Sequence, residues 1–364
     1  KKGYPLLVVF CADLFFGRAN HLVHYQPFQY LGRKRLPANS FMKITDPFPD
    51  SICPFCFTEK KSETICPCCG CGEDSLPQFV AQQILPGSVL NSRFVVGKLL
   101  GQGSFGITYL CFDSERNQKV AIKEYFPSEY VRRQNLEMLP LADEYSDTVI
   151  RGMEYFCEEV KILIEFNQHS NIVQISDYFF ENGTAYFVME YVEGASLKNY
   201  LDVQGDRISF EESWEILLPI MKTLAEVHEA GLLHRDIAPD NIFLCKNGEP
   251  KLLDFGSSRF AFSRDIMEFP LTIKLGYAPP EQYSDFDQQG PWTDIYQMGA
   301  VFYRTITGRI PPEATERLVS DPLISPIQLG LDIPEEADRS IIKALDLDPR
   351  DRFRNFSEMI KGFQ

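Results

Sequence analysis

Short apolar, β-branched runs separated by polar or glycine-rich turns fill the chain between residues 94 and 191, and such runs predict β-strands. The predicted strands cover residues 94–100, 107–112, 119–126, 172–180 and 184–191. Asn182-Gly183 separates the last two strands, and its tolerance of positive φ angles predicts a hairpin turn.

Helical spacing replaces this pattern in two places. After a polar stretch, Phe156, Val160, Leu163 and Ile164 recur at the spacing of an amphipathic helix. Beyond Ser196 the pattern is mainly helical, and a last helix is predicted over 356–363. A small strand-rich half with one helix therefore precedes a larger helical half.

Composition narrows the functional classes. The 364 residues are 44% hydrophobic and 24% charged, and no run of 18 apolar residues predicts a membrane span. The net charge of −15 would repel a phosphate backbone, so we expect protein and small-molecule partners and no nucleic acid.

Six of the ten cysteines crowd into residues 53–71, which predicts a metal site in a reducing, cytoplasmic setting. The repeated Cys-Pro-x-Cys pattern favours one tetrahedral set of thiolates for a structural Zn²⁺, namely Cys53, Cys56, Cys66 and Cys69. Cys68 with Cys71 is the overlapping alternative for the second knuckle.

A glycine-rich turn and a lysine carry the first catalytic signal. Gly-x-Gly-x-x-Gly at 101–106 would let backbone amides approach a polyphosphate, but a strand follows it, whereas a dinucleotide fold requires a helix. Lys123 lies on the third predicted strand, where its ammonium group could bind phosphate oxygens.

Three further motifs come later in the chain, in the order 234–241 (HRDIAPDN), 254–256 (DFG) and 279–281 (PPE). From about residue 94 onward the chain therefore resembles a protein kinase. This resemblance implies an α+β fold of two lobes, a small β-rich N-lobe with one key helix and a larger helical C-lobe. The cysteine cluster ahead of it resembles a zinc ribbon, an arrangement similar to bacterial serine/threonine kinases.

The expected division has four parts. Residues 1–50 form an extension without regular structure, 51–72 the zinc ribbon, 73–91 a linker and 92–364 the catalytic domain, whose lobes meet near residue 192. The ribbon is a candidate protein-interaction module.

The resemblance implies catalytic roles. Asp254 and Asn241 would bind Mg²⁺ or Mn²⁺, Lys123 the phosphates of ATP, and Asp236 the substrate hydroxyl. Glu159 would pair with Lys123, because it shares a helix face with Phe156, whereas the alternative Glu158 points about 100° away.

The resemblance also implies the ATP site and its surroundings. Met189 would be the gatekeeper, the backbone of 190–192 would meet adenine, and Ala121 and Phe243 would sandwich it. The implied nucleotide-binding residues are Gly101, Gln102, Gly103, Ser104, Phe105, Gly106, Thr108, Ala121, Lys123, Met189, Glu190, Val192, Asn241, Phe243 and Asp254.

Three further positions match structural partners of the family. Asp294 would hold the catalytic-loop backbone, and Glu281 would form a buried ion pair with Arg352.

Two positions depart from the family pattern. Ala238 stands where most serine/threonine kinases carry a lysine, and Lys274 stands where they carry a threonine. We expect Lys274 to supply the missing cation at the site, and a solvated lysine is the alternative.

The expected function is ATP-dependent phosphorylation of protein serine and threonine hydroxyls. Serines and a threonine of the segment 254–281 are candidate autophosphorylation sites. The alternative is a pseudokinase that recruits partners, which has no chemical need for Lys123, Asp236, Asn241 and Asp254 together.

Overall fold

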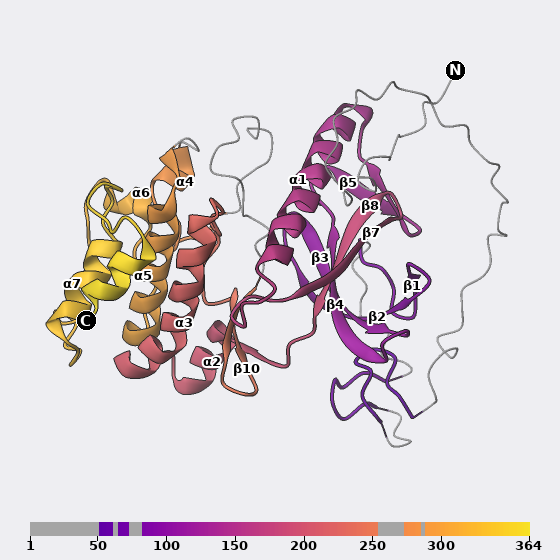
Figure 1. Cartoon of the computed structure of the whole chain (residues 1–364), viewed down its shortest axis with the longest axis horizontal. Helices are drawn as coiled ribbons and strands as arrows, with labels where there is room; N and C mark the ends of the chain where they lie inside the picture. The colour runs from indigo at the N-terminus through magenta and orange to yellow at the C-terminus, as the bar shows by residue number, and fades with distance from the viewer. Residues whose placement is uncertain (1–50, 61–64, 73–81, 254–272, 285–287) are drawn as a thin grey trace.

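The computed structural model describes residues 51–60, 65–72, 82–253, 273–284 and 288–364. The expected extension over 1–50 lies outside these ranges. Figure 1 shows a sheet-rich lobe beside a helical lobe, with the indigo loops of residues 51–60 and 65–72, here called the cysteine module, lying beside the sheet. This is the expected two-lobed arrangement.

The N-lobe is built on a six-stranded antiparallel sheet with the order β1-β2-β3-β4-β8-β7. Its strands are β1 (Val89–Leu90), β2 (Phe94–Gln102), β3 (Gly106–Asp113), β4 (Gln118–Tyr125), β7 (Ile175–Glu181) and β8 (Thr184–Glu190). The predicted hairpin between β7 and β8 is confirmed, because Asn182 and Gly183 both have positive φ, 53° and 73°.

One helix crosses this sheet (Figure 1). α1 (Ser146–Glu165) carries Phe156, Val160 and Leu163 on its buried face and packs against β7 and β8. The predicted amphipathic helix is thus confirmed, and it begins ten residues before its first predicted apolar position.

The polar stretch before α1 contains a hairpin that sequence patterning missed, β5 (Val131–Gln134) with β6 (Glu137–Pro140). A short 3-10 helix, η1 (Asp143–Tyr145), follows it. Arg133 of β5 reaches the buried carboxylate of Glu124 at 2.6 Å. Tyr109 and Tyr186 donate to the same carboxylate at 3.0 and 2.9 Å. The hairpin is thereby fixed to the strand that carries Lys123.

The C-lobe is helical apart from a small sheet in the order β11-β10-β9. Its elements are β9 (Gly194–Ser196), α2 (Leu197–Gln204), α3 (Phe210–Glu229), β10 (Ile242–Cys245), β11 (Pro250–Leu252), α4 (Glu281–Ser284), α5 (Pro291–Thr307), α6 (Ala314–Arg317), α7 (Glu335–Ala344) and α8 (Phe356–Gly362). α5 is the central helix, since it is buried on nearly every side and packs against α3, α7 and α8. Within the described ranges, no helix is long and apolar enough to cross a membrane.

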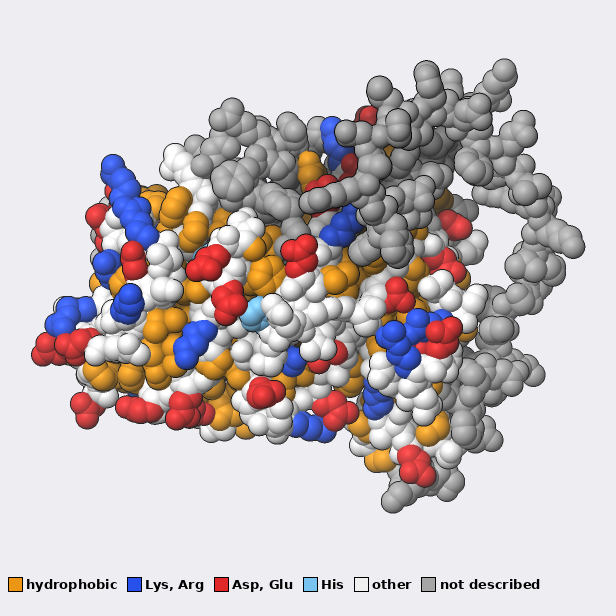
Figure 2. Space-filling view, viewed as in Figure 1, with side chains coloured by type: hydrophobic (Ala, Val, Ile, Leu, Met, Phe, Trp, Pro, Cys, Tyr) orange, Lys and Arg blue, Asp and Glu red, His pale blue; other side chains and the backbone are white. Residues whose placement is uncertain are grey.

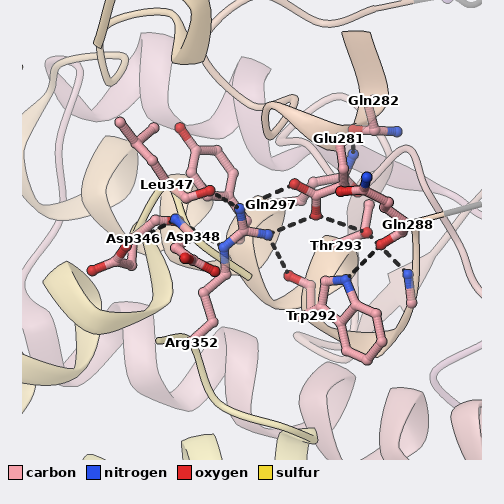
Figure 3. A network of polar contacts seen from close by, with 12 residues as sticks. Glu281, Gln282, Gln288, Trp292, Thr293, Gln297, Asp346, Leu347, Asp348 and Arg352 are labelled. Atoms are coloured by element: carbon pink, nitrogen blue, oxygen red, sulfur yellow. Dashed lines mark hydrogen bonds and ion pairs between the residues drawn. The ribbon is translucent and has the colours of Figure 1, made fainter. Parts of the chain in front are cut away.

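The expected ion pair between Glu281 and Arg352 is confirmed and is fully buried (Figure 3). Two guanidinium nitrogens of Arg352 contact the two carboxylate oxygens at 2.7 and 3.1 Å. Thr293 donates to Glu281 at 3.0 Å, and Arg352 donates to the carbonyl of Asp346 at 2.6 Å. The pair joins the start of α4 to α5 and to the segment before α8.

Arg352→Met should lower the unfolding free energy by about 3–5 kcal/mol, because it leaves the carboxylate of Glu281 buried without its counter-charge. Urea denaturation would measure the change. Arg350→Met is the matched control: Arg350 makes an exposed pair with Asp348 at 2.6 Å, so its loss should leave stability unchanged. Equal stability of the two variants would contradict the assignment.

Candidate functional site

A cavity of about 380 Å³ lies between the lobes, lined by the N-lobe strands, the segment after β8, and β10 and β11. Nine of the expected nucleotide-binding residues line it, namely Gly101, Thr108, Ala121, Lys123, Met189, Glu190, Val192, Asn241 and Phe243. Asp254, expected to bind metal, lies outside the described residues. The pocket is mostly apolar with a lysine and an amide at one end, which suits a flat base and a charged tail.

The glycine-rich turn between β2 and β3 leaves space beside this cavity. A Cβ atom on Gly101 or Gly103 would meet nothing within 4 Å. A Cβ on Gly106 would lie 2.7 Å from the carbonyl oxygen of Glu124, so only glycine allows β3 and β4 to approach this closely. The absent side chains give the open cradle that a polyphosphate needs.

The other residues of the turn hold its shape. The amide of Gly103 donates to the carbonyl of Gly106 at 2.9 Å, and the carbonyls of Ser104 and Phe105 accept from Ser128 and Phe126. Gln102 is exposed, and its side chain pairs with Gln82 and Gln83.

Lys123 of β4, which lines the cavity, and Glu159 of α1 are both buried, each about 7% exposed. Burial lowers the pKa of Lys123 and raises that of Glu159 to about 8, while the charge of each group opposes the shift of the other. Glu158 is exposed. The helix thus presents Glu159 to the lysine, as its spacing predicts.

The catalytic loop gathers three expected residues within contact distance. Nδ2 of Asn241 donates to Oδ2 of Asp236 at 2.8 Å and to its carbonyl at 2.7 Å. Nζ of Lys274 lies 3.1 Å from Oδ1 of Asp236 and 4.0 Å from Asp240. Ala238 is buried in the loop. Ala238 brings no charge to the carboxylate of Asp236, and the ammonium group of Lys274 contacts it.

Asp294 of α5 binds the backbone of the loop at 234–241, as expected. Its carboxylate accepts the amides of His234 and Arg235 at 2.8 and 2.7 Å and contacts the His228 ring at 2.8 Å. Burial alone would raise the pKa of Asp294, but these contacts hold it below the ordinary value. Arg235 adopts a φ of +63°, which a non-glycine residue needs strong contacts to maintain.

Sequence patterns missed several supporting residues. Gln297 accepts the amide of Ile237 at 2.8 Å and donates to the carbonyl of Arg235 at 2.9 Å. Lys251 contacts Glu190 at 2.6 Å and braces the segment that would meet adenine. In the sequence, Gln297 and Lys251 differ from their neighbours only in being polar residues within otherwise apolar elements.

In the cysteine module, the four sulfur atoms of the expected set lie within 4.8 Å of one another, and the cysteines are not disulfide-bonded. Cys68 is exposed, and Cys71 donates to the carbonyl of Cys69. The sequence left open whether Cys66 with Cys69 or Cys68 with Cys71 completes the set, and the structure gathers Cys66 and Cys69. Four converging thiols fit a tetrahedral metal.

These features define a two-lobed phosphotransferase scaffold. The protein kinase domain family matches residues 94–360, and the chain belongs to that family. It is similar to proteins named "Probable serine/threonine-protein kinase" from Clostridium perfringens, at 27% identity over 75% of this chain, and Lactococcus lactis, at 28% over 75%. It spans 38% and 42% of their lengths.

A solved structure described as "PpkA-294 apo form" is 32% identical and has a TM-score of 0.68. The match covers 78% of this chain and all of that one. The relatives bear serine/threonine kinase names, and nothing among them favours a pseudokinase.

The buried ring of His234 makes the stability of the protein depend on pH, which provides a test of the loop that carries Asp236. Its Nδ1 accepts from the amide of Asp236 at 3.2 Å, and its Nε2 contacts the carbonyl of Leu253. The neutral ring therefore links the loop that carries Asp236 to the residue that precedes the 254–256 motif. Burial lowers its pKa below 6.5, so the unfolded chain binds the proton first. Stability should therefore fall as the pH drops below about 6.5, by at most about 1.4 kcal/mol per unit.

Urea unfolding between pH 7.5 and 5 would measure this slope in the wild type and in His234→Gln, which stays neutral. His234→Gln should lack the part of the pH slope that comes from protonation of the ring. Identical slopes in the two proteins would show that the ring carries no linked proton.

Proposed function

We propose that this chain is an active, ATP-dependent protein serine/threonine kinase. The observation that carries the proposal is the contact of Asp236 with both Asn241 and Lys274 beside the cavity that holds Lys123. Such a set orients a hydroxyl and neutralises a phosphate, which a purely scaffolding domain does not need. Family membership and the names of the relatives support the same reading.

Each residue of the site would have its own role. Lys123, oriented by Glu159, would bind the α and β phosphates, and Asp236 would accept the hydrogen bond of the substrate hydroxyl. Asn241 and Asp254 would hold Mg²⁺ or Mn²⁺. The bound metal would supply charge neutralisation of the phosphates. The adenine would lie between Ala121 and Phe243.

We propose that Lys274 stabilises the charge of the transferring phosphate. Its ammonium lies on Asp236 and only a quarter of its side chain is exposed, which argues against a solvated surface role. A cation fixed in this position needs no reorganisation during the reaction.

We also propose the domain division given by the motifs, with 51–72 as a Zn²⁺ module and 92–364 as the catalytic domain. The free thiols support a reducing compartment such as the cytoplasm. The protein substrates would be phosphorylated on serine and threonine hydroxyls.

Phosphate transfer from labelled ATP with magnesium to a generic protein substrate tests the activity. The wild type should modify serine and threonine, and Asp236→Asn should lower kcat by at least about a hundredfold while nucleotide binding persists. Transfer equal to that of the variant, in a wild type that binds ATP, would point to the pseudokinase alternative.

Lys274→Ala should lower kcat roughly a hundredfold with the KM for ATP nearly unchanged, because the charge is needed most in the transition state. Lys274→Arg should restore part of the rate. The matched control is Lys198→Ala, which removes an exposed lysine 3.7 Å from Asp240 and should keep the wild-type rate. A wild-type kcat in Lys274→Ala would rule out the proposed role.

A further inference from the structure

The cysteine module is packed against the catalytic domain. Its own residues Phe55 and Phe57 form a buried cluster with Val95 of β2 and Leu110 of β3. The ring of Phe57 lies 5.7 Å from that of Phe112. The module therefore shares a core with the N-lobe sheet.

The alternation of side chains along β2 and β3 explains why this face needs a cover. Phe94, Val96 and Cys111 point into the main core, while Val95 and the β3 residues Leu110 and Phe112 point to the opposite face. Val95 and Leu110 are only 4% and 1% exposed. A sheet that is apolar on both faces must be covered on both.

Gly97 marks the closest approach. A Cβ at this position would lie 2.6 Å from the carbonyl oxygen of Phe55 and 2.6 Å from the ring of Phe57. The same carbonyl accepts the amide of Lys98 at 2.8 Å, at a point where the pairing of β2 with β3 is irregular. The module thus satisfies a backbone donor of the strand that leads into the glycine-rich turn.

Two routes lead from this contact to the nucleotide cavity. β2 continues from Lys98 to Leu100 and Gly101, which line the cavity. Tyr191, in the segment after β8, lines the cavity and also packs against the cluster of the module. Apart from these two routes, Thr58 of the module accepts a hydrogen bond from Lys119 of β4, the strand that carries Lys123.

We propose that the module is a metal-dependent regulatory element of the kinase, whose occupancy by Zn²⁺ sets nucleotide affinity. The four thiolates hold Phe55 and Phe57 in the conformation that docks on Gly97. Without the metal, so small a module has too little core of its own to keep this shape. β2 then loses its cover and its partner for Lys98, and both routes to the cavity loosen.

The test uses the full chain and reads zinc content, amide exchange of residues 94–102 without nucleotide, and the Kd for ADP with magnesium. The double variant Cys53→Ser/Cys66→Ser should lose zinc, exchange faster in β2 and bind ADP roughly three- to tenfold more weakly, as expected for the loss of about one hydrogen bond and its packing. Cys68→Ser is the matched control and should match the wild type in all three measurements.

Gly97→Ala separates docking from metal binding, because its methyl group obstructs the contact while the thiols remain. It should retain zinc yet reproduce the faster exchange and the weaker ADP binding. Phe57→Ala weakens the same contact from the side of the module and serves if Gly97→Ala does not fold. Wild-type exchange and Kd in the zinc-free variant, or in the docking variants, would overturn the proposal.

The expected change in ADP affinity rests on the proposed function, because it assumes that the cavity binds a nucleotide. Amide exchange in β2 is measured without catalysis or ligand. A wild type that fails to bind ADP would therefore count against the kinase assignment, and unchanged exchange on loss of zinc would count against the coupling.

Discussion

The buried carboxylate of Asp294 makes the contacts on which the geometry of the candidate site depends. It lies in the most buried helix of the C-lobe and accepts two consecutive amides of the catalytic loop. Those contacts maintain the positive φ of Arg235, and the turn that results presents Asp236 to Asn241 and Lys274. A carboxylate buried to this degree is tolerated because two backbone amides donate to it and the ring of His228 contacts it.

The N-lobe uses the same device on a second carboxylate. Glu124 is fully buried, and Arg133, Tyr109 and Tyr186 donate to it. Because Glu124 follows Lys123 in β4, the two side chains point to opposite faces of the sheet. The network holds the strand from the face of Glu124, and the charge of Glu159 acts on Lys123. Each lobe therefore holds one residue of the candidate site in place through a buried acid.

The surface contributes less to the positioning of the site than these internal contacts. Figure 2 shows basic and acidic side chains interspersed on the face drawn, despite the net charge of −15. Exposed pairs of this kind contribute little to stability. The contacts that position the site are buried ion pairs and hydrogen bonds.

Local chemistry determined much of what the sequence could predict: the strands around the glycine-rich turn, the hairpin at Asn182-Gly183, and the cysteine knuckles all depend on residues a few positions apart. The resemblance to protein kinases that the motifs carry predicted the two lobes and the pair Glu281–Arg352. The β5–β6 hairpin and the docking of the module were decided by tertiary structure, because Arg133 and Phe57 find their partners only after distant strands are assembled. The sequence could name Lys274 as a candidate cation, but only folding brought it to within 3.1 Å of Asp236, since the two lie 38 positions apart in the chain.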